Sequence, residues 1–140
     1  MEAPATKKLD SSLELNEENT HILGGAFWNL VRLYGLGRRE QATLLGVNPN
    51  NRKSLKDYEQ KKAIPLDPDK FLRVGFLLGI HKNLRILFPQ NVNIVYHWMT
   101  TRQELFHHKT PMEFIEENPA NSLLHLATVR RALDILRTGF

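Results

Sequence analysis

The chain contains no cysteine among its 140 residues. That absence excludes disulfides, thiolate zinc sites and a catalytic thiol, and it fits a reducing compartment. Long apolar runs are also missing: the uncharged, mostly apolar stretch over residues 22–31 is interrupted by two glycines and is too short to span a bilayer. The polar N-terminal residues lack the apolar core of a signal peptide. We therefore expect a cytoplasmic protein with no membrane partner.

Catalytic signatures are absent as well. The sequence has no G-x-S-x-G elbow, no HExxH motif and no glycine-rich loop of the kind that cradles phosphates. His97, His107 and His108 could suggest a metal site, but the last two are adjacent and would point in different directions, and no carboxylate pattern accompanies them. We expect no catalytic residues, no metal ligands and no cofactor.

The charge is unevenly distributed along the chain. The net charge is +4, yet residues 1–20 carry two lysines against five acids, residues 21–89 carry twelve basic residues against five acids, and residues 90–140 are balanced. A basic middle segment is typical of a protein with a polyanionic partner such as nucleic acid. A solvated basic face explains the same pattern equally well.

The local patterns predict an all-α fold. Four pairs place a capping residue before proline, a combination that favours a helix start: Asn48-Pro49, Asp67-Pro68, Thr110-Pro111 and Asn118-Pro119. Apolar residues recur at helical intervals, and no stretch alternates as a strand would. We expect a helical bundle with helices over 20–34, 38–45, 50–61, 68–88, 91–99, 111–117 and 119–137. Gly75 and Gly79 would each weaken the fourth helix by about 1 kcal/mol relative to alanine, so it either bends there or packs closely against another helix.

Three regions follow from these patterns. Residues 1–18 are acidic and without a periodic apolar stripe, so we expect a flexible tail. Residues 19–89 would form an N-terminal domain, and residues 90–140 a C-terminal domain, with Pro89 between them.

Residues 38–58 are a helix-turn-helix candidate. Ala42 is the small residue expected where two helices cross, Gly46 would end the first helix, and Val47, Leu55 and Tyr58 would anchor the pair in the core. The connection is about three residues longer than a tight turn, and Asp57 and Glu59 would repel a phosphate backbone. The donors expected to contact DNA are Arg38, Asn50, Arg52, Lys53, Ser54 and Lys56. A plain helical hairpin with a solvated polar face is the alternative.

Three further stretches match a known family. The order and spacing typical of that family are found in residues 36–47 (LGRREQATLLGV), in residues 71–89 (FLRVGFLLGIHKNLRILFP), and in Trp98-Met99 followed by Phe106, Thr110-Pro-Met-Glu-Phe-Ile115 and the closing Val129, Leu133 and Gly139. On these residues the chain resembles the Xre/MbcA/ParS antitoxins, which pair with RES-domain toxins. The resemblance covers residues 36–140. It departs from the family pattern in the lengthened turn after Asn48, at Asp57, and at His108-Lys109, where a glycine is usual.

The resemblance implies an antitoxin that neutralises an NAD-consuming RES-domain toxin by covering its active site with the last helix. It also implies an Xre-like half that binds operator DNA, and a homodimer or a hetero-oligomer with the toxin. The residues implied in toxin binding are Trp98, Thr110, Pro111, Arg130, Arg131, Arg137, Gly139 and Phe140. The arginines would equally complement a helix dipole. Two other functions stay open: a stand-alone DNA-binding regulator, and a helical adaptor that has lost DNA binding.

Overall fold

The predicted all-α class is confirmed by a computed structural model, which describes residues 14–139. Residues 1–13, most of the predicted tail, and Phe140 lie outside the described residues. The α-helices are α2 (Glu17–Leu33), α3 (Arg38–Leu45), α4 (Arg52–Lys61), α5 (Pro68–Leu87), α6 (Val92–His97), α7 (Pro111–Glu116) and α8 (Ser122–Thr138). Three short 3₁₀ helices join them: η1 (Trp98–Thr100), η2 (Glu104–Phe106) and η3 (Pro119–Asn121).

The first described helix starts inside the predicted tail. The side chain of Asn16 accepts a hydrogen bond from the Asn19 amide at 2.8 Å and so caps α2. Glu17 and Glu18 occupy the first turn, where negative charge complements the positive end of the helix dipole. The cap and the two acids explain why α2 begins at residue 17 rather than at residue 20.

The four cap-plus-proline pairs have different outcomes. Thr110 makes a complete capping box with Glu113 and starts α7. Asn118 caps η3, so the helix predicted over 119–137 is a 3₁₀ turn followed by α8. Pro68 begins α5, although Asp67 makes no side-chain cap bond. Asn48-Pro49 does not start a helix, because the Asn48 side chain accepts from the Asn50 amide in a turn and α4 begins only at Arg52.

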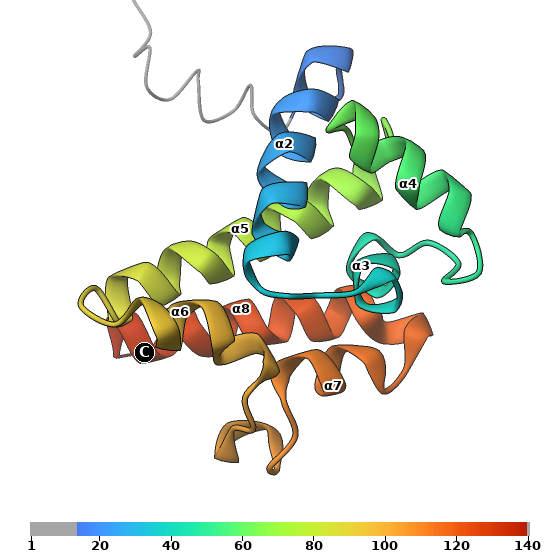
Figure 1. The fold of residues 1–140 in the computed structure, drawn as a ribbon. Helices are drawn as coiled ribbons and strands as arrows, with labels where there is room; N and C mark the ends of the chain where they lie inside the picture. The colour runs from blue at the N-terminus through green and yellow to red at the C-terminus, as the bar shows by residue number, and fades with distance from the viewer. Residues whose placement is uncertain (1–13, 140) are drawn as a thin grey trace, which may run out of the picture.

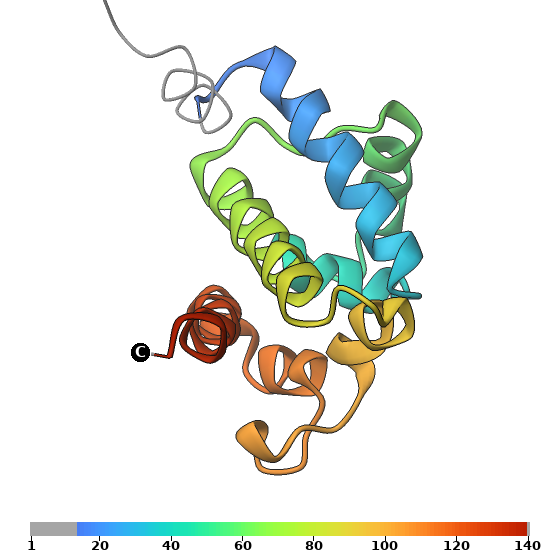
Figure 2. The same cartoon turned by 90° about the vertical axis from the view of Figure 1, so that its left-hand side faces the viewer.

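The longest helices, α5 and α8, share the most extensive contact in the fold and lie side by side in both views (Figures 1 and 2). They run in the same direction, because Arg73 and Ser122 meet near their starts and Asn83 and Arg137 meet near their ends. The contact contributes to one continuous hydrophobic core that includes residues on both sides of Pro89. The domain boundary near residue 89 stays a prediction.

Gly79 lies where α5 passes closest to a side chain of α8. A Cβ atom at Gly79 would come within 2.4 Å of Arg130 Nε. Of the two explanations offered for a glycine here, a bend or close packing, the second applies to Gly79.

None of the helices described over residues 14–139 combines the length and the apolar character that a membrane span requires.

Candidate functional site: two helical surfaces and a groove

The helix-turn-helix candidate is a hairpin of α3 and α4. Ala42 is fully buried, and Gly46 ends α3 in the left-handed conformation with φ of +67°. The Val47 amide then donates to the Ala42 carbonyl, which fixes the start of the connection. Leu55 turns into the core from α4. Val47 and Tyr58, the other expected anchors, are partly buried against the core. The connection between the two helices runs over residues 46–51, and whether the hairpin is a helix-turn-helix stays a prediction.

Three cations on α4 form an exposed surface, named here the α4 basic face: Arg52, Lys53 and Lys56. Within residues 14–139 these side chains have no hydrogen bond or ion pair. Asn50 is exposed beside them, and Ser54 is half-buried. The structure therefore brings together five of the six residues that the sequence assigned to DNA contact.

Arg38, the sixth residue, is held within the fold. Its guanidinium donates to Glu59 at 2.6 Å and to Gln41 at 2.9 Å. The ion pair also neutralises Glu59, one of the two acids expected to repel a phosphate backbone. Asp57 remains exposed on α4. Of the predicted DNA contacts, Arg38 is the one whose charge is already paired.

The last helix has two different faces. Leu126, Val129 and Leu133 are buried in the core. On the solvent side, Leu124 is 62% exposed and Ile135 is 41% exposed, and the exposed Arg131 lies on the same helix face, seven residues after Leu124 and four before Ile135. These three residues are named here the α8 outer face. Large exposed aliphatic groups beside an arginine are typical of a protein-binding surface.

The three predicted arginines on α8 are not equivalent. Arg130 lies against Gly79, and its Nε atom is buried without a hydrogen-bond partner in the described part of the chain. Arg137 Nε donates to the buried Asn83 side chain at 2.5 Å. Arg131 alone of the three has no interaction with another described residue. Gly139 ends α8 with φ of +83° and is exposed.

Of the other described residues predicted to bind the partner, Trp98 and Pro111 are buried and Thr110 is half-buried. Trp98 is buried and meets Phe106 edge to face, with ring centroids 6.3 Å apart. Pro111 is buried at the start of α7, and Thr110 is occupied in capping that helix. Since α7 contacts both η1 and α8, Trp98 and Pro111 support the last helix from below, and the Thr110 hydroxyl is already used in the cap.

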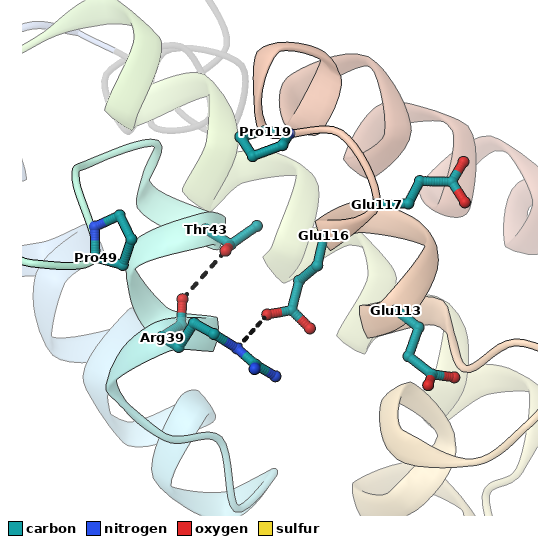
Figure 3. A pocket seen from close by; sticks show the side chains of 7 residues that line it. All are labelled: Arg39, Thr43, Pro49, Glu113, Glu116, Glu117 and Pro119. Atoms are coloured by element: carbon teal, nitrogen blue, oxygen red, sulfur yellow. Dashed lines mark hydrogen bonds and ion pairs between the residues drawn. The ribbon is translucent and has the colours of Figure 1, made fainter.

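A groove separates α3 from α7 and η3 (Figure 3). Glu116 points across it to Arg39, whose Nε lies 3.1 Å from the Glu116 carboxylate, whereas Glu117 points away. Burial raises the pKa of Glu116 above its ordinary value, and the positive charge of Arg39 opposes that rise. Pro49 and Pro119 face the same groove from opposite sides.

Arg73 is the functional candidate that sequence reasoning missed. It is only 9% exposed, and its Nε donates to Asp69 at 2.9 Å. Nη1 donates to the Thr43 carbonyl and to Ser122 Oγ, so one side chain of α5 joins α3 and α8. Burial raises the Asp69 pKa, but hydrogen bonds from Lys70 and Arg73 and their charges outweigh it and leave that pKa lowered. The Asp69–Arg73 spacing of four residues on a predicted helix was the available signal.

The three histidines weighed as metal ligands do not assemble. No group of three His, Asp or Glu side chains in residues 14–139 is placed to hold a metal ion. The His97 ring is hydrogen-bonded to the Asn93 carbonyl, and His107 and His108 occupy a left-handed turn.

Comparisons with protein-family models, with curated proteins and with solved structures found no match for this chain.

Proposed function

We propose that this protein is a non-catalytic antitoxin that binds and neutralises a RES-domain, NAD-consuming toxin through its last helix. The proposal starts from the sequence resemblance over residues 36–140. Its main structural support is the α8 outer face, where Leu124, Ile135 and Arg131 are exposed on a helix whose opposite face packs in the core.

The chemistry of this face suits a protein partner. Burying exposed leucine and isoleucine side chains provides about 25 cal/mol per Å² of apolar area removed from water. Arg131 retains all its donors, and a guanidinium is well suited to bidentate contact with a carboxylate. Since Arg130 and Arg137 contact α5, we assign the direct contact to Arg131 and a positioning role to the other two.

The test is co-purification with the product of the adjacent gene, followed by an NAD-consumption assay of that product alone and in complex. A stable complex with suppressed NAD loss is expected. Absence of a complex, or a partner that consumes no NAD, would overturn the proposal. Co-expression should also restore growth to cells that express the partner alone.

Two variants locate the contact. Arg131→Glu and Leu124→Asp change exposed residues of this face and should leave the fold intact, which circular dichroism checks. If these residues are interface hot spots, each should weaken the complex by about 2 kcal/mol or more, which is about thirtyfold in affinity. Lys53→Glu on the α4 basic face is the matched control and should bind the toxin as the unmodified chain does. Equal affinities for all three variants would refute the assignment to α8.

A second function is supported by the α4 basic face. Three unpaired cations next to Asn50 provide donors for phosphates and base edges, so we propose operator binding as an additional or alternative role. DNA binding through this face should weaken steeply with salt, because each neutralised phosphate releases counterions. Replacing Lys53 or Lys56 by glutamine should lower the salt slope by about one unit each. Toxin binding without any operator binding would instead identify a helical adaptor.

A further inference from the structure

A pocket of about 380 Å³ lies between the connection after α3 and the start of α8. Thr43, Gly46 and Pro49 line one side of it, and Pro119 and Ser122 line the other; among residues 14–139, Arg73 is its only charged lining residue. The pocket shares Thr43, Pro49 and Pro119 with the groove of Figure 3, so the two hollows adjoin. Neither proposed function uses this pocket.

The guanidinium of Arg73 is fixed from three directions. Asp69 accepts from Nε, and the Thr43 carbonyl and Ser122 Oγ accept from Nη1. A Cβ atom at Gly46 would come within 2.4 Å of Arg73 Cζ and 2.7 Å of Nη2, so only glycine leaves room for the group. A charged group held this rigidly loses little conformational freedom when it binds a ligand.

The N–H groups on Arg73 Nη2 are available to a ligand. This atom makes no hydrogen bond within residues 14–139, and it is not among the buried polar atoms of this part of the chain that lack a partner, so solvent reaches it. The Ser122 hydroxyl accepts from Arg73 and keeps its own proton for donation. Asn48, which also lines the pocket, uses its side-chain oxygen in the turn and keeps its amide nitrogen free.

We propose that this pocket is a binding site for a small molecule that bears a phosphate or carboxylate group, with the oxyanion on Arg73 Nη2. The Ser122 hydroxyl and the Asn48 amide supply further donors. Among residues 14–139, no carboxylate lines the pocket, and Asp69, which accepts from Nε, is not one of its lining residues. The rest of the ligand extends between Pro49 and Pro119 toward Glu116 and Arg39.

The location gives such a ligand access to both halves of the chain. It would contact the connection that leads into α4 as well as the first residue of α8. Binding would therefore rigidify the segment that positions the α4 basic face. This site is independent of the proposed function, since no residue of the α4 basic face or the α8 outer face lines the pocket.

The test is a titration of the full chain with inorganic phosphate and, separately, with acetate, at constant ionic strength, followed by ¹H–¹⁵N NMR. Saturable shifts are expected for the Arg73 Nε–H and for the amides of Gly46, Val47 and Ser122. A stronger response to phosphate identifies phosphate-bearing ligands, and a stronger response to acetate identifies carboxylates. The absence of saturable shifts with both anions would overturn the proposal.

Variants separate the site from general attraction of anions to a basic protein. Asn48→Ala removes one donor without touching Arg73, and Ser122→Ala removes one donor together with an acceptor of Arg73 Nη1; each should weaken binding at least about fivefold. Asn48 is exposed, so its variant tests the site with little risk to the fold. Lys53→Gln removes an exposed cation elsewhere and should leave the affinity unchanged. Equal weakening by Lys53→Gln, or shifts centred on α4, would refute a site at Arg73.

Discussion

Gly24 and Gly25 are adjacent on α2, yet an added methyl group should have opposite effects on stability at the two positions. A Cβ atom at Gly24 would lie 2.4 Å from Ala63 Cα and 2.7 Å from the Lys62 carbonyl oxygen. At Gly25 a Cβ atom would meet nothing within 4 Å. We therefore predict that Gly24→Ala destabilises the protein and that Gly25→Ala stabilises it.

The magnitude for Gly24→Ala follows from the contacts around residue 63. The clashing atoms belong to the backbone, so α2 must move away from the segment after α4, and overpacking of this kind costs about 1–3 kcal/mol. The movement strains the hydrogen bond from Trp28 Nε1 to the Ala63 carbonyl, 2.8 Å long, and its loss costs about 1 kcal/mol. The higher helix propensity of alanine returns about 1 kcal/mol, which leaves a net loss of about 2 kcal/mol.

Urea denaturation of the unmodified chain and the two variants measures both effects. Gly24→Ala should lower the transition midpoint by about 1 M, given a typical dependence of about 2 kcal/mol per molar urea for a chain of this size. Gly25→Ala should raise the free energy of unfolding by up to about 1 kcal/mol. The fluorescence of Trp28, buried against Ala63, should change only in the first variant. A stabilising effect of Gly24→Ala would refute the close approach of α2 to residues 62–63.

Three other predictions address caps, a buried amide and pH. Thr110→Ala removes the acceptor of the Glu113 amide and should cost about 1 kcal/mol in urea denaturation, whereas Thr128→Ala within α8 should change stability by less than about 0.5 kcal/mol. Asn83→Ala breaks the bonds to Asp134 and Arg137 and should cost about 2 kcal/mol, with faster amide hydrogen exchange at the end of α8; unchanged exchange there would contradict the contact. Burial, and then the charge of Arg85, lower the pKa of His81, whose Nδ1 lies 2.9 Å from the Tyr34 hydroxyl. The unfolded chain therefore binds this proton more readily, so stability should fall as pH drops below about 6.5, and His81→Gln should reduce that dependence in urea midpoints measured from pH 8 to pH 5.

Local sequence signals predicted helix ends well where the end depends on a nearby residue, such as a capping side chain or a glycine in the left-handed conformation. The Thr110-Pro111-x-Glu113 pattern becomes a capping box, and Gly46 takes the left-handed conformation that ends α3. Asn48-Pro49 misled the prediction because its asparagine satisfies an amide two residues away, within a turn, as asparagine also does outside helices. The same dipeptide thus forms a turn at Asn48-Pro49 and caps a 3₁₀ helix at Asn118-Pro119.

The assignment of individual charges needed tertiary structure. Arg38 and Glu59 are 21 residues apart and meet only because α3 and α4 fold against each other. Arg130 and Arg137 contact α5 only because α5 and α8 run side by side in the same direction. A sequence shows that these side chains are charged, but not which of them have partners within the fold.

This distinction changes which residues are able to act on a partner. An arginine whose donors are already bound must break those bonds before it contacts another molecule, and the cost offsets much of the gain. Arg131, Arg52, Lys53 and Lys56 incur no such cost, because they have no interaction within the described residues. Arg73 is intermediate between the paired and the unpaired cations. Its Nε and Nη1 atoms donate hydrogen bonds within the fold, and its Nη2 atom donates none within the described residues. The groups left over after folding, rather than all the basic residues of the sequence, therefore define the surfaces on which the proposed functions depend.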